Sequence, residues 1–277
     1  MFERLSRSWV LVKASAAVLR TDKELMLFPL ISSAATLVVM ATFLIPVFAL
    51  RVFEHGIGVG GAVVGFLFYF CQYSVIIFFN CALVGAAMIR LDGGDPSLRN
   101  GFEAARSRLP SILGYAAIAA TVGVFLQALK NKDNNFIVRL VGSGLGAAWT
   151  LATFMVVPVL VSRDIGPIDA LKESIGLLKR TWGENAIGNV GIGAVFGLIM
   201  FLFLLVGAGL AFAAYQVSLP LAIGVGVLFL IGVLLLGIYQ AALSGVYSAV
   251  LYRYAISREA PAAFRGAMLE DAFRSKA

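Results

Sequence analysis

The chain has 277 residues, of which 60% are hydrophobic and only 13% charged, and its formal net charge is +7. A soluble domain carries roughly a quarter charged residues, so this composition excludes an ordinary water-soluble fold. The basic residues lie in short segments between apolar runs instead of gathering on one face, which argues against nucleic acid as a partner.

The first 24 residues combine charges with a regular apolar stripe. The stripe recurs at steps of three and four residues, which predicts an amphipathic helix. Its members are Phe2, Leu5, Trp9, Val12, Ala16 and Leu19. This segment has no short apolar core followed by a small-residue cleavage site, so we expect no removed signal peptide.

Six apolar runs follow, and each is long enough to cross a bilayer as a helix, which takes about 20 residues. We predict spans at Leu25–Leu50, Ile57–Met88, Pro110–Leu129, Phe136–Val161, Ala186–Tyr215 and Leu219–Tyr252. The second and sixth are longer than a perpendicular crossing requires, so we expect them to tilt or to project beyond the hydrocarbon. Residues 216–218 separate the last two spans, and they fit either a tight hairpin or a break in one long segment.

The basic residues favour one orientation of these spans. Eighteen Lys and Arg residues lie in the N-terminal segment, the second-to-third connection, the fourth-to-fifth connection and the C-terminal tail, against four on the other side of the predicted spans. Because cytoplasmic segments carry the excess of Lys and Arg, we expect both termini in the cytoplasm.

A threefold internal repeat runs through the chain. Three times a span ends in a basic residue, a polar turn and a proline, at 88–96, 162–167 and 252–261. Proline suits the first turn of a helix, and we expect Asp95 before Pro96 to cap the next helix. The predicted fold is all-α, with six transmembrane helices as three parallel hairpins, each preceded by a cytoplasmic amphipathic helix. It is a single membrane domain over residues 1–277, with repeat units at about 1–90, 91–163 and 164–256 and a C-terminal amphipathic helix at 257–277.

The helices after the first two prolines keep their apolar residues on one face. The stripes are Leu98, Phe102, Ala105 and Leu109 in one helix, and Ile168, Leu171, Ile175, Leu178 and Trp182 in the other. Such helices lie in the membrane interface or pack under the spans. We expect their main apolar anchors, together with that of the N-terminal helix, to be Trp9, Phe102, Leu178 and Trp182.

Residues 7–32 carry the most specific pattern in the chain. It consists of Arg7-Ser8-Trp9, Leu11, Lys13 and Ser15, then Asp22-Lys23-Glu24-Leu25 and Phe28-Pro29-Leu30-Ile31-Ser32. This pattern resembles a family of uncharacterised bacterial six-helix membrane proteins, catalogued only as a domain of unknown function. More distantly, the helix-plus-hairpin plan resembles the membrane-anchor domain beside some glycerophosphodiester phosphodiesterases, whose catalytic domain this sequence lacks. The resemblance implies a bacterial inner-membrane location and supplies no catalytic residue.

Few groups in the sequence are suited to catalysis. The single histidine, His55, lies beside Glu54 in a connection, and the pair falls short of the three or four ligands of a zinc site. Titratable residues are confined to the membrane interfaces instead of converging in a pocket. We therefore expect neither an enzyme nor a bound metal or cofactor.

Uncharged polar residues do lie within the predicted spans. Asn80 and Thr153 each stand ten places before the basic residue that ends their span, and Ser244 stands nine places before the third. Gln72 lies two turns from Asn80, and Gln240 one turn from Ser244. Polar side chains are unfavourable against lipid, so we predict that these five residues form a cluster that faces protein or an internal cavity.

Two classes of function fit this pattern. The first is a structural or scaffolding membrane protein that organises lipid or partner proteins through its cytoplasmic helices, as a monomer or a homo-oligomer. The second is a passive pore or carrier for a small solute, lined by the uncharged polar residues. Ion-coupled transport usually needs a charged group at depth, and interhelical hydrogen bonding accounts for the polar residues equally well, so we favour the first.

Overall fold

The computed structural model describes residues 15–49, 59–131, 136–180 and 182–257. Every element within these ranges is a helix, so the all-α prediction is confirmed there. The elements are η1 (Lys23–Met26), α2 (Leu27–Ala49), α3 (Val59–Leu91), α4 (Leu98–Ser107), α5 (Leu109–Asn131), α6 (Phe136–Thr153), α7 (Val156–Ser162), α8 (Pro167–Arg180), α9 (Trp182–Tyr215) and α10 (Leu219–Ser257). Trp9, His55 and the predicted C-terminal helix from residue 258 onward lie outside the described residues.

Six helical stretches in the described ranges are long and apolar enough to cross a membrane, as predicted. The fourth differs from the expected single span, because the helix is interrupted at Phe154 and Met155 between α6 and α7. Pro158 accounts for the interruption. It has no N–H to bond to the carbonyl of Phe154, and its ring crowds that carbonyl.

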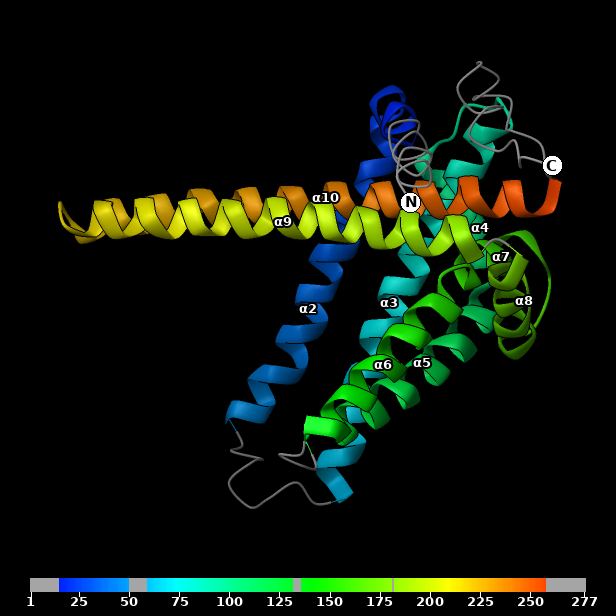
Figure 1. Cartoon of the computed structure of the whole chain (residues 1–277), viewed down its shortest axis with the longest axis horizontal. Helices are drawn as coiled ribbons and strands as arrows, with labels where there is room; N and C mark the ends of the chain where they lie inside the picture. The colour runs from blue at the N-terminus through cyan, green and yellow to red at the C-terminus, as the bar shows by residue number, and fades with distance from the viewer. Residues whose placement is uncertain (1–14, 50–58, 132–135, 181, 258–277) are drawn as a thin grey trace.

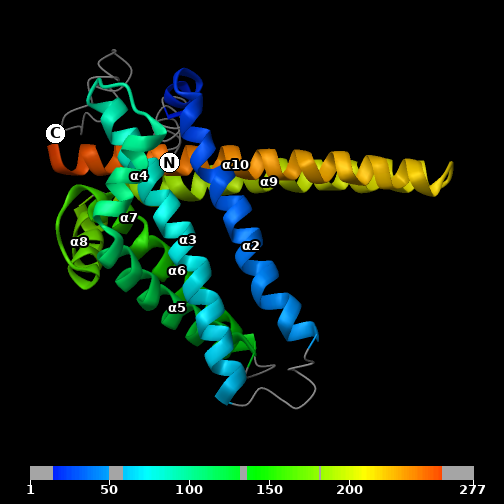
Figure 2. The same cartoon turned by 180° about the vertical axis from the view of Figure 1, so that it is seen from behind.

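Helices α9 and α10 run side by side and are joined at residues 216–218 (Figures 1 and 2). Each helix accepts an aromatic ring from the other at a glycine. A Cβ added to Gly207 would lie 2.4 Å from the ring of Phe229, and one added to Gly232 would lie 2.5 Å from the ring of Phe203. The centroids of these two rings are 4.8 Å apart. Residues 216–218 are therefore a turn between two closely packed helices.

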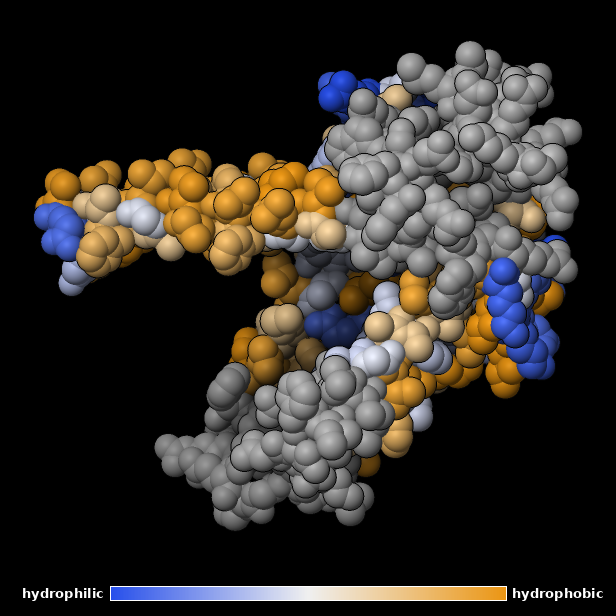
Figure 3. Space-filling view, viewed as in Figure 1, coloured by the Kyte–Doolittle hydropathy of each residue, from blue (hydrophilic) through white to orange (hydrophobic). Residues whose placement is uncertain are grey.

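The long helices diverge from one end of the molecule. Helices α2, α3, α5 and α6 run obliquely in one direction, whereas α9 and α10 project across them (Figures 1 and 2). The projecting part of this pair is hydrophobic along its length (Figure 3).

The buried core lies where the helices meet. Three chain segments supply most of it, residues 81–91 of α3, residues 155–160 around α7 and residues 242–252 of α10. We call these three segments the hub. Tyr247 is the largest of the fully buried side chains, and a Cβ added to Gly245 would lie only 2.4 Å from Leu83. Helices α3 and α10 are longer than a simple membrane crossing requires, and their extra residues form part of the hub.

Helix α3 ends in a turn that glycine makes possible. The N–H of Gly94 donates to the carbonyl of Ile89 at 2.9 Å, and the N–H of Gly93 donates to the carbonyl of Arg90 at 3.0 Å. This is a Schellman turn, which needs a left-handed residue, and Gly93 has φ +87°. The turn places Asp92 directly beyond the hub.

The short helices α4 and α8 pack on the longer helices through faces that combine small and large side chains. The buried residues are Gly101 and Ala105 on α4, and Ala170, Ser174, Leu177 and Leu178 on α8. The predicted stripe is therefore right at Leu178 and wrong at Ile168, which is 59% exposed. Helices approach one another most closely where the side chains are small, so Gly101 and Ser174, which the predicted stripes omit, also belong to the buried faces.

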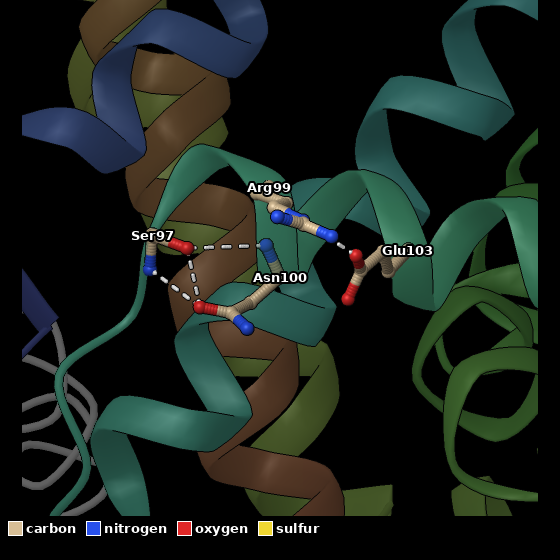
Figure 4. Close-up of polar contacts among 4 residues, drawn as sticks. All are labelled: Ser97, Arg99, Asn100 and Glu103. Carbon is tan, nitrogen blue, oxygen red and sulfur yellow. Dashed lines mark hydrogen bonds and ion pairs between the residues drawn. The ribbon is translucent and has the colours of Figure 1, made fainter.

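Ser97 caps α4, not the expected Asp95. The N–H of Asn100 donates to Ser97 Oγ at 3.2 Å, and the N–H of Ser97 donates to Asn100 Oδ1 at 3.1 Å (Figure 4). Such a reciprocal pair satisfies two backbone donors at the start of a helix, which leaves Pro96 just outside it. On the exposed side, Arg99 Nε donates to Glu103 at 2.8 Å, and this contact raises the pKa of the Arg99 guanidinium.

Candidate functional site

Ion pairs close the outer end of the hub. Each of the three arginines that end a predicted span contacts an acid from another part of the chain. The pairs are Arg90 with Asp22 at 2.8 Å, Arg163 with Glu173 at 3.1 Å, and Arg253 with Asp92. A fourth pair, Arg108 with Asp164, joins the start of α5 to the turn after α7. The basic residues that the sequence suggested as topology signals therefore also hold helix ends together.

The interruption between α6 and α7 is completed by Ser174 of α8. Its hydroxyl donates to the carbonyl of Ala152 at 2.6 Å and accepts the N–H of Met155 at 3.2 Å. Ser174 is fully buried, so these two bonds satisfy backbone groups that water does not reach. The sequence analysis missed this residue, although a serine four places after Ala170 on the small-residue face of α8 was a usable signal.

Thr153 lies at this interruption, as the last residue of α6. Its hydroxyl donates to the carbonyl of Trp149 at 2.8 Å, and the side chain of Tyr115 on α5 hydrogen-bonds to it. Thr153 therefore faces protein, and it links α5 to α6.

The other four members of the predicted cluster lie on α3 and α10. Gln72 is buried, with its Nε2 donating to the carbonyl of Thr36 at 3.5 Å, and its Oε1 finds no partner among the described residues. Asn80, Gln240 and Ser244 are half-buried. In the described part of the chain, no hydrogen bond joins any two of the five residues. Asn80 and Thr153 lie just before their hub segments, and Ser244 lies inside the segment 242–252.

Two of the four predicted anchor residues are described well enough to place. The ring of Phe102 lies 5.5 Å from that of Phe28 and 5.8 Å from that of Phe79, so this anchor contacts α2 and α3. Leu178 is 5% exposed on α8. Trp182 begins α9 instead of ending the helix before it, and its side chain and Trp9 lie outside what the structure describes.

A polar cavity of about 500 Å³ opens beside the second ion pair. Its lining residues are Arg163, Glu173, Gly176, Leu177, Ala255 and Ile256. The two charged side chains bind each other, so the cavity presents no free catalytic pair. Among the described residues, no group of three or more His, Cys, Asp or Glu is placed to hold a metal ion.

A family model matches residues 59–262, which include both long helices of the hub and most of the chain. The chain belongs to DUF6159, a family of unknown function. The match starts after the N-terminal pattern at residues 7–32, and no curated protein matches the chain. Membership of DUF6159 fits a multi-pass membrane protein and assigns no activity.

In this DUF6159 chain, Ser174→Ala is expected to lower the free energy of unfolding by about 1–2 kcal/mol. The change leaves the carbonyl of Ala152 and the N–H of Met155 buried without a partner, and each unsatisfied group is unfavourable. Thermal unfolding of the purified protein in mild detergent measures the effect. Ser107→Ala is the control, because the Ser107 hydroxyl is exposed and bonds only within its own helix. Equal stability of the two variants would show that Ser174 does not support the interruption.

Proposed function

We propose that this DUF6159 protein is a non-catalytic scaffold of the bacterial inner membrane, which organises the lipid around its diverging helices. Its hub side faces the cytoplasm, together with both termini. Three observations support this proposal, and the closed packing of the hub is the one that carries it.

The hub is packed with apolar side chains where a pore would need an opening. Side chains from α3, α7 and α10 meet there, and Ala82, Val156 and Val246 are among those with no exposed surface. A dry centre of this kind favours a scaffold over a solute path through the monomer.

The arrangement around the hub favours a parallel threefold repeat. Arg90, Arg163 and Arg253 stand at or just after the ends of the three hub segments, and each forms an ion pair at the same end of the molecule. The first two are followed by α4 and α8, and both of these short helices bury small residues. The excess of basic residues at this end supports its location in the cytoplasm.

Permeability of liposomes that contain the full-length protein tests the proposal. We expect small neutral solutes such as urea and glycerol to cross these membranes no faster than protein-free ones, with a known channel protein as the positive control. We also expect several phospholipids per chain to remain after purification in mild detergent, as measured by phosphate assay. Solute flux that Asn80→Leu abolishes without unfolding the protein would replace the scaffold by the pore, and a lipid-free preparation would remove the role in lipid organisation.

A further inference from the structure

The projecting helix pair exposes apolar side chains in almost every direction. Around one and a half turns of α9, Phe201, Leu202, Leu204 and Leu205 are 60%, 51%, 52% and 58% exposed. On a helix these four residues point to different sides. Only the strip that carries Phe203 and Gly207 is covered, and α10 covers it.

Helix α10 shows the same pattern. Leu228, Leu230 and Leu235 are 67%, 59% and 60% exposed, whereas Phe229 and Gly232 contact α9. The side of the pair that faces the other helices is therefore as exposed as the side that faces away. A protein partner would cover one face of the pair, whereas large apolar side chains are exposed on several sides of both helices in the described residues.

Helix length gives a second, independent observation. The apolar stretch Leu219–Arg253 has 35 residues, which is about 52 Å of helix. The hydrocarbon layer is only about 30 Å thick, so this stretch fits inside it when the helix leans by about 55° from the membrane normal. A second axis that leans as much to the other side of the normal crosses the first steeply, as α3 crosses α10 in Figure 1.

We infer that the spans cross the bilayer as two diverging legs, with lipid acyl chains filling the space between them. One leg is the α9–α10 pair, and the other is formed by α2, α3, α5 and α6. The hub lies at one leaflet, and the two legs spread toward the other. This inference rests on the proposed scaffold function and names its ligand as the acyl chains of membrane phospholipids. It also predicts that the legs lean less in a thicker bilayer, because tilt is the usual response to mismatch.

Distances between the tips of two legs test the divergence. Spin labels at Gln127→Cys and Ser218→Cys, both exposed positions, are introduced into a Cys71→Ala chain in nanodiscs, and Cys81 is left in place because it is fully buried. If each leg is about 35 Å long from the hub to its tip and the two legs are close to perpendicular, the two labels lie about 45 Å or more apart. The distance is expected to shrink in longer-chain lipid and to grow in shorter-chain lipid. Labels at Arg106→Cys and Lys179→Cys, exposed on the hub side, are the control and should not move.

Oxygen accessibility along α10 tests what fills the space. Single labels at positions 227–235 are expected to show high accessibility everywhere except at Phe229, Gly232 and Val233, which form the strip toward α9. A second minimum on another face would mean that protein covers it. A tip distance below about 20 Å would then identify a closed bundle of neighbouring helices, and a long distance would identify a second copy of the chain.

The two proposals fail separately. Short tip distances with impermeable liposomes would overturn the diverging legs and leave the scaffold. Solute flux would overturn the scaffold whatever the distances are.

Discussion

Gly101→Ala is expected to destabilise the protein by about 2–3 kcal/mol, and Gly101→Val by more. A Cβ at this position would lie 2.4 Å from the ring of Phe28 and 2.7 Å from the backbone carbonyl of Ala82. The ring can shift, but the carbonyl belongs to the hydrogen-bonded backbone of α3, so α4 must move away from it. Overpacking of a close contact typically costs about 1–3 kcal/mol. Thermal unfolding in detergent, followed by circular dichroism, measures the loss.

Gly176→Ala is the matched control for this prediction. Gly176 also lies inside a short helix of the hub side, but a Cβ there meets nothing within 4 Å. Alanine favours a helix over glycine by about 0.5–1 kcal/mol, so this variant is expected to be slightly more stable than the natural chain. If both alanine variants changed stability in the same direction, the close approach of α4 to α3 would be wrong.

Arg90→Gln is expected to lower stability by about 2–3 kcal/mol. The side chains of Arg90 and Asp22 are 28% and 12% exposed, and they join the end of α3 to the residue before η1. Removing the guanidinium leaves the Asp22 carboxylate largely buried without its counter-charge. Breaking a fully buried pair costs about 3–5 kcal/mol, and an exposed pair contributes about 1 kcal/mol or less, so this partly buried pair falls between them.

A double-mutant cycle with Asp22→Asn separates the pair from other effects. The double variant is expected to be more stable than the sum of the two single changes predicts, because no unpaired charge remains. Arg99→Gln is the control, since Arg99 pairs with Glu103 on the exposed face of α4 (Figure 4), and little change is expected there. Additive single changes would show that Arg90 and Asp22 do not interact.

The sequence was informative wherever hydrophobicity alone decides structure. Long uncharged runs have no stable place except a bilayer, which is why the bounds of α2, α5 and α10 follow the predicted spans closely. The interruption after Thr153 was missed because Pro158 lies in an otherwise uniform apolar run. Proline is tolerated in such helices when another group satisfies the freed backbone, and that group, Ser174, comes from a different helix.

The candidate site was harder to predict, because a sequence pattern shows the polar residues of one span but not their bonding partners on another span. Thr153 was identified from its position, but Tyr115, which bonds to it, belongs to another span. The buried faces of α4 and α8 were obscured for a related reason. Gly101 and Ala105 contribute little to a hydrophobic pattern, yet their small size lets α4 approach α3, while the larger Ile168 stays exposed. How closely two helices approach depends on the volume of the side chains between them, and a pattern of apolar residues does not include side-chain volume.

The ion pair between Arg253 and Asp92 can form only late in the synthesis of this protein. The two residues are 161 positions apart, so at roughly 5–20 residues per second the ribosome needs about ten to thirty seconds to supply the second after the first. During that interval α10 is not yet present, so Leu83 and the other hub residues of α3 lack their packing partner. A truncated chain that ends before residue 242 lacks the α10 segment of the hub, so Leu83 never makes this contact.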